Sequence, residues 1–132
     1  MARPSDYQRH LKPAAGFKLP GLEVVRNQYP GRETLVRFEI PEFTCICPKT
    51  GLPDFALLKL EYVPARLLVE LKSLKLYVHG FRNLGVFHES VANRVLDDLV
   101  AATKPRRARL SADFSVRGGI HTVVEVAYKW KG

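Results

Sequence analysis

The sequence predicts an α+β fold, in which a four-stranded antiparallel sheet carries two helices on one face. Apolar and polar residues alternate in two segments before residue 65 and in two more after residue 106, as in half-buried strands. Between these pairs, apolar residues recur every three or four positions, as on one face of a helix. The predicted order is therefore ββααββ, and 132 residues fit one domain.

The four strands are bounded by turn-forming residues. Pro41 is expected to end the first strand, and a turn-rich segment, residues 41–54, to lead into the second, which stops at Pro64. Arg117-Gly118-Gly119 predicts a hairpin turn between the last two. The strands are predicted at residues 33–40, 54–64, 107–116 and 120–130.

Two helices are predicted, at residues 70–83 and 88–103. In the first, apolar residues recur every three or four positions and so share one face. The second has a similar apolar stripe, which ends before Pro105. The first face consists of Leu71, Leu74, Val78 and Phe81, and the second of Val91, Val95, Leu99 and Ala102.

Composition limits the classes of function. Residues 1–21 are rich in proline and glycine, so we expect a partly ordered arm before a single domain at 22–132. The chain has no apolar run of bilayer length, no apolar segment after its basic N-terminus, and two cysteines too close for an unstrained disulfide. These features predict a cytoplasmic protein. A net charge of +8 favours a polyanionic partner: nucleic acid, an anionic membrane or a phosphorylated cofactor.

Cys47 and Asp54 are the first candidates for chemistry. Cys47 precedes a proline in a predicted loop, where a thiol can face a cleft and act as a nucleophile if nearby groups favour the thiolate. Asp54 follows a Gly–Pro turn that could fold it back toward Cys47, and a protonated carboxyl there could donate a proton. The alternatives are a small buried side chain for Cys47 and a capping residue for Asp54.

Charged residues on the two predicted helices are candidates for binding. Lys72 and Lys75 share a face that could hold phosphates or simply be solvated, and no GxGxxG or GxxxxGK motif offers a backbone cradle. His88 and Glu89 begin the second helix, where Glu89 could accept hydrogen bonds from a guanine-type base or favour the helix dipole. The cysteine and histidine spacings match no closed zinc pattern, so no metal is predicted.

Three blocks of this sequence resemble the NADPH-dependent 7-cyano-7-deazaguanine reductases, the nitrile reductases of queuosine biosynthesis (the QueF family), in their short single-domain form. They are CPKTGLPDF at 47–55, ELKSLKLY at 70–77 and FRNLGVFHE at 81–89, with RGG at 117–119 in addition. The resemblance runs from about Leu22 to Trp130. It implies the tunnelling fold (T-fold), with subunits assembled into barrels as a decamer of two pentamers and active sites at subunit interfaces.

The resemblance also implies a role for each residue. Cys47 would attack the nitrile to form a covalent thioimide, Asp54 would protonate the nitrogen, and His88 would lie near the nitrile and the nicotinamide. The deazaguanine ring of the substrate would be held by Val69, Glu70, Leu71, His88 and Glu89. The phosphates of NADPH would meet Lys72, Lys75 and Arg117.

Two other functions stay open at this point. A related group keeps the cysteine and the aspartate but acts as an amidinotransferase on the nitrile carried in tRNA, without NADPH. The ELKSLKLY block, which holds Lys72 and Lys75, argues against that activity here. A basic RNA-binding module is the alternative without catalysis, although the aromatic residues do not interleave with lysine and arginine as in a stacking platform.

Overall fold

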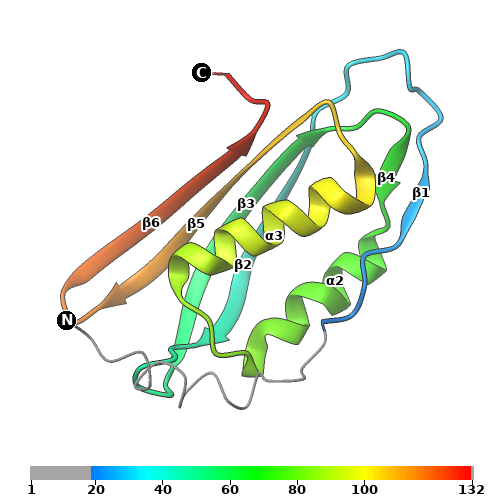
Figure 1. Ribbon diagram of the computed structural model, residues 1–132. Helices are drawn as coiled ribbons and strands as arrows, with labels where there is room; N and C mark the ends of the chain where they lie inside the picture. Colours follow the sequence, from blue (N-terminus) through cyan, green and yellow to red (C-terminus); the bar gives the residue numbers. More distant parts are fainter. Residues whose placement is uncertain (1–18, 132) are drawn as a thin grey trace.

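A computed structural model describes residues 19–131 as a four-stranded antiparallel sheet with two helices on one face (Figure 1). The sheet order is β2-β3-β5-β6. This confirms the predicted α+β class, while most of the predicted arm, residues 1–18, lies outside the described residues. In chain order the elements are β1 (Val24–Arg26), β2 (Val36–Ile46), β3 (Pro53–Val63), β4 (Leu67–Val69), α2 (Leu71–His79), η2 (Gly80–Asn83), α3 (His88–Thr103), β5 (Arg107–Arg117) and β6 (Ile120–Tyr128).

Two short strands were not predicted, so the order ββααββ is incomplete. β1 and β4 form a separate antiparallel ribbon, in which Val24 pairs with Val69. Each has three residues, which is too short for an alternation to show in the sequence. The ribbon matters because it leads directly into α2 and places Val69 and Glu70 beside residues 23 and 24.

The prediction that Pro41 ends the first strand is wrong. β2 runs through Pro41 to Ile46, and its register against β3 shifts between Ile40 and Phe43. β2 is an edge strand, where a residue without an N–H is tolerated, and a bulge is one of the few places for proline in a sheet. The irregularity changes which positions are buried, so that Phe43 and Cys45 both join the core.

The remaining long strands follow the predicted pattern closely. Even-numbered residues of β3, and those of β5 as far as Phe114, face the helices, and most odd-numbered ones face the other side of the sheet. Gly118 and Gly119 both have positive φ, 58° and 78°, as the two-residue turn between β5 and β6 requires. Arg117 therefore pairs with Ile120 at the end of the sheet where β3 begins.

The two helices cover the core face of the sheet. α3 has the predicted bounds and ends at Thr103, and Lys104 caps it just before Pro105. α2 is shorter than predicted, because a 3-10 turn, η2, follows it from Gly80. A Cβ at Gly80 would lie 3.0 Å from both Leu19 and Pro20, so the 19–20 segment packs closely against this end of the helix.

The hydrophobic core lies between the helices and the sheet. It combines alternate residues of the central strands with one face of each helix, and each fully buried leucine or valine contributes about 1.5–3 kcal/mol. Its members include Leu58, Leu60, Leu110, Leu74, Val91, Val95 and Leu99. The other face of the sheet is partly charged, and Glu61 there pairs with both Arg37 and Arg109 at 3.0 Å. No helix among residues 19–131 is long and apolar enough to cross a membrane.

Candidate functional site

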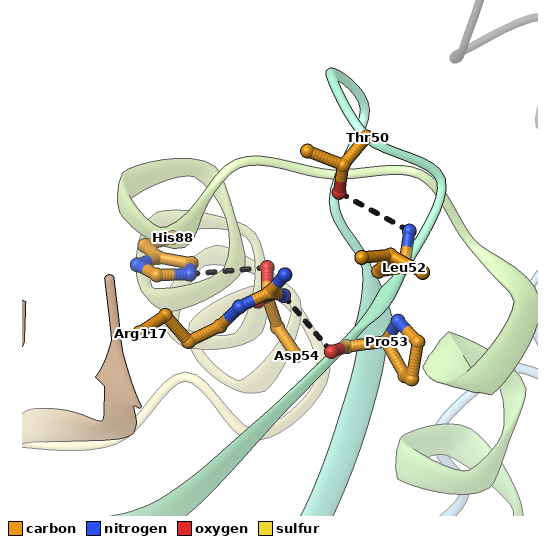
Figure 2. Close-up of polar contacts among 6 residues, drawn as sticks. All are labelled: Thr50, Leu52, Pro53, Asp54, His88 and Arg117. Carbon is orange, nitrogen blue, oxygen red and sulfur yellow. Dashed lines mark hydrogen bonds and ion pairs between the residues drawn. The ribbon is translucent and has the colours of Figure 1, made fainter. Parts of the chain in front are cut away.

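Cys47 lies in the tight loop that joins β2 to β3. Its amide donates to the carbonyl of Leu52 at 2.8 Å, and its carbonyl accepts from the amide of Gly51 at 2.8 Å. Gly51 has a φ of 74°, which a glycine adopts at little cost. The hydroxyl of Thr50 accepts from the amide of Leu52 at 3.2 Å (Figure 2). The loop is therefore fixed by its own backbone, and the partly buried thiol has a defined position.

The surroundings of Cys47 favour its thiolate. Burial opposes the charged form most strongly, and the nearby Asp54 carboxylate opposes it as well. Hydrogen bonds from the side chain and backbone of Thr50 and from the backbone of Lys49 outweigh these effects and lower the pKa of Cys47. A lowered pKa increases the nucleophilic fraction of a thiol at neutral pH.

Cys45 is a very different thiol. It lies within β2, opposite Asp54 of β3, and its side chain is fully buried in the core. Burial, together with the charges of Asp54 and Cys47, raises the pKa of Cys45 to about 12. Of the two cysteines, only Cys47 has the exposure and the electrostatic surroundings of a nucleophile.

Asp54 is buried and held from both sides. Its residue is 3% exposed, because it is the second residue of β3 and points to the core face. Arg117, at the end of β5, donates from Nη1 to Oδ1 of Asp54 and also to the carbonyl of Pro53 at 2.9 Å. On the other side, Nε2 of His88, the first residue of α3, lies 3.1 Å from Oδ2 (Figure 2).

The imidazole of His88 is oriented by an aromatic neighbour. Its ring stacks on the buried ring of Phe114 in β5, with centroids 3.7 Å apart and an angle of 8° between the planes. β5 thus supports both partners of Asp54, since it carries Phe114 and Arg117. Cys47, Asp54, His88 and Arg117 form what we call the Cys47 cluster, which lies where the β2–β3 loop, α3 and the end of β5 meet.

The second group of predicted residues lies elsewhere, between β4 and the first turn of α2. Val69 is buried and its amide donates to the hydroxyl of Tyr62 at 3.0 Å. Glu70 caps α2, because its carboxylate accepts from the amides of Lys72 and Ser73, each at 2.8 Å. Leu71 is exposed, as are Lys72 and Lys75.

These two groups do not meet within one chain. The C-terminal end of α2 leads through η2 to Leu84 and Val86, which bond to Ile46 beside the Cys47 cluster. Glu70 is at the opposite end of α2, and nine helical residues at 1.5 Å each span about 13 Å. Glu89 lies nearer to the cluster, next to His88, but it is exposed rather than buried.

A groove of about 770 Å³ lies between β2 and α2, away from the Cys47 cluster. It is mostly apolar, and neither Cys47 nor Asp54 lines it. The candidate site is therefore identified by the reactive side chains of the Cys47 cluster and not by the volume of this groove. Residues that line the groove include Ile40, Phe43, Phe55, Leu71, Lys75 and Val78.

The sequence did not predict which residues contact Cys47, His88 and Asp54. Thr50 could have been suspected, because a hydroxyl three residues after a cysteine in a turn can reach back to it. Phe114 carries no local signal, since its alternation in β5 predicts only a core residue. Arg117 was predicted to meet a cofactor, and its contact with Asp54 depends on the pairing of β3 with β5.

The fold matches a solved structure of a protein described as an archaeosine synthase QueF-Like, in the apo form. The TM-score is 0.70, and the match covers 76% of this chain and 99% of that one. At 22% identity, this likeness shows the fold alone.

Sequence comparisons show the family. The family model of the QueF-like proteins matches residues 53–132. A relative from Nitrosococcus oceani is 58% identical over 111 residues, covering 84% of this chain and 86% of the relative. One from Halorhodospira halophila is 59% identical over 107 residues, covering 81% and 91%. Both relatives are named NADPH-dependent 7-cyano-7-deazaguanine reductase, and this chain belongs to their family, within the QueF-like proteins.

Proposed function

We propose that this chain reduces the nitrile of 7-cyano-7-deazaguanine to an aminomethyl group with NADPH, in the biosynthesis of queuosine. The observation that carries the proposal is the Cys47 cluster, where a thiol with a lowered pKa lies near a buried carboxyl group. A nitrile is a weak electrophile, so its reduction benefits from a thiolate nucleophile and from an acid for the nitrogen. The names of relatives at 58% and 59% identity support the same reaction.

The first chemical step that we propose is the formation of a thioimide on Cys47. The thiolate sulfur bonds to the nitrile carbon, one π bond of the nitrile breaks, and its electron pair moves to the nitrogen. Asp54 gives that nitrogen a proton, so no charge remains on the adduct. The contact of Asp54 with His88 gives the carboxyl group a titratable partner from which to regain a proton.

Substrate recognition is proposed for residues of both groups. His88 and Glu89 begin α3, so Glu89 can accept hydrogen bonds from the N–H and amino groups of the base close to Cys47. Val69, Glu70 and Leu71 lie about a helix length away, and the carboxylate of Glu70 already caps α2. All five residues can contact one small substrate only if a second chain supplies some of them.

A homo-oligomer is therefore part of the proposal. Among residues 19–131, β2 and β6 form the edges of the sheet, and an edge strand is a template for pairing with a neighbouring chain. The apolar groove beside β2 provides further surface for a neighbour. These features support association with further copies of the chain, with active sites where subunits meet. The family resemblance is the basis for proposing the tunnelling fold, with subunits in two pentameric rings.

The residues proposed for NADPH are Lys72 and Lys75. Both are exposed on α2, and no ion pair with another described residue engages either ammonium group, so both can meet phosphates. Bound NADPH supplies hydride, of which the reduction of a nitrile to an amine needs two. Arg117, the third residue predicted for the phosphates, is bonded to Asp54 and Pro53. Its role is developed below.

The test is the loss of NADPH absorbance when the purified chain receives 7-cyano-7-deazaguanine. We expect two NADPH to be consumed per nitrile, and we expect Cys47→Ala to abolish the activity. Cys45→Ala is the matched control, because it removes a thiol two residues away that is buried in the core. A wild-type chain that converts the nitrile without consuming NADPH would contradict the proposal and favour the amidinotransferase alternative.

A further inference from the structure

Each carboxylate oxygen of Asp54 contacts one side chain, and the two side chains differ in kind. Oδ1 accepts from the guanidinium of Arg117, and Oδ2 lies 3.1 Å from Nε2 of His88. Figure 2 shows the two partners approaching the carboxyl group from β5 and from α3. Arg117 is also tied to the carbonyl of Pro53 at 2.9 Å, so its guanidinium is fixed to the start of β3.

The donor and acceptor properties of these partners decide where a proton can reside. A guanidinium only donates hydrogen bonds, so Oδ1 must act as an acceptor and cannot carry the exchangeable proton. A histidine nitrogen can donate or accept, depending on its tautomer. The exchangeable proton is therefore confined to the pair formed by Oδ2 of Asp54 and Nε2 of His88.

The position of His88 reinforces this assignment. Its ring stacks on Phe114 at 3.7 Å, which restricts rotation of the imidazole plane. Nε2 therefore stays directed at Oδ2. Together, Phe114 and Arg117 hold the two members of the proton-bearing pair from a single strand, β5.

We propose that Arg117 is a positioning residue for proton transfer. By donating to Oδ1 of Asp54, it keeps the proton that is transferred at Oδ2. This inference rests on the proposed function and deepens it. When sulfur bonds to the nitrile carbon, the electron pair of the broken π bond goes to nitrogen, and nitrogen takes the proton from Oδ2 of Asp54 as that O–H bond breaks. The step leaves Asp54 as a carboxylate, with both of its partners in place.

The test measures the rate at which the intact chain forms the covalent adduct with 7-cyano-7-deazaguanine in the absence of NADPH. Arg117→Gln should slow adduct formation by about tenfold or more, the size of a lost hydrogen bond between charged groups. Arg117→Lys keeps a cation but not the forked geometry, so it should give an intermediate rate. Arg109→Gln is the matched control, because Arg109 also lies on β5 and bonds to a carboxylate of β3, Glu61, at 3.0 Å on the opposite face. It should stay within about twofold of the wild-type rate, because its pair is remote from the site.

The pH profile of adduct formation separates positioning from a structural role. The titratable groups that face Asp54 are Cys45 from β2, Cys47 from the loop and His88 from α3, with Arg117 from β5 as the fixed charge. Arg117→Gln removes a fixed charge that contacts Oδ1 of Asp54, so the shape of the pH profile should differ from that of the wild type. Loss of folding alone would lower the rate and leave the shape of the profile unchanged.

The outcomes are distinct. Wild-type rate and profile in Arg117→Gln, combined with a raised Michaelis constant for NADPH, would overturn the inference and leave Arg117 as a cofactor residue. If Arg117→Gln does not fold, a wild-type rate and profile in Arg117→Lys would overturn it as well, because a lysine cannot reproduce the fork. Failure of the wild-type chain to form any adduct would instead contradict the covalent step of the proposed function.

Discussion

Replacement of Thr50 by valine tests the physical basis of the nucleophile. The side chain of Thr50 is one of the groups whose hydrogen bonds lower the pKa of Cys47 against the opposing effect of burial. Valine has nearly the same shape but no hydroxyl, so the thiolate loses that partner. The pKa of Cys47 should rise, and a smaller fraction of the thiol should be ionised at neutral pH.

The magnitude follows from the exposure of the two residues. A hydrogen bond to a charged group contributes about 1.5–3 kcal/mol. Thr50 is exposed and Cys47 only partly buried, so solvent screening places the effect at the lower end. Because a difference of about 1.4 kcal/mol changes an equilibrium constant tenfold, alkylation at neutral pH should slow by up to about tenfold.

The assay is the rate of alkylation of Cys47 by iodoacetamide as a function of pH. Cys45 does not interfere, since it is buried and its pKa is about 12. Thr50→Ser keeps the hydroxyl and should titrate like the wild type. Thr44→Val is the second control, because the Thr44 hydroxyl donates to the carbonyl of Glu42 at 3.2 Å and not to the loop. An unchanged midpoint in Thr50→Val would refute the reasoning.

Four further variants probe the other proposed roles. Asp54→Asn should slow adduct formation at Cys47 without NADPH, since an amide cannot supply the proton, and a normal rate by intact-mass spectrometry would contradict this role. Lys72→Ala or Lys75→Ala should raise the Michaelis constant for NADPH, by an effect that salt reduces, and leave the adduct rate nearly normal. An adduct defect with unchanged NADPH affinity would place this face of α2 at the substrate. Glu89→Ala should weaken adduct formation before any NADPH is present, as measured by the dependence of its rate on nitrile concentration, and an unchanged dependence would count against base recognition.

The fold could be predicted where the signals were local. The bounds of α3 follow from its apolar stripe and from Pro105, and the β5–β6 turn follows from two consecutive glycines. The path of β2 could not be predicted, because whether Pro41 ends a strand depends on its place in the sheet. At an edge and beside a bulge, the missing N–H removes no ladder hydrogen bond.

In the candidate site, too, local signals could be predicted, whereas contacts between distant residues could not. The sequence predicted Cys47, Asp54 and His88, and the structure brings the carboxyl and the imidazole within 3.1 Å. The contact between Arg117 and Asp54 joins residues 63 positions apart, so it needs the register of β3 against β5. For Glu70, the family resemblance implies a binding role, whereas the fold of one chain uses its carboxylate to cap α2.

The central claim is that Cys47 is the nucleophile, and peptide mapping of the adduct tests it most directly. The purified chain is mixed with 7-cyano-7-deazaguanine in the absence of NADPH, and the protein is then digested and analysed by mass spectrometry. The account predicts one added substrate mass on the peptide that contains the two cysteines, retained in Cys45→Ala and lost in Cys47→Ala. An adduct that persists in Cys47→Ala, or unmodified protein under conditions of rapid turnover, would contradict it.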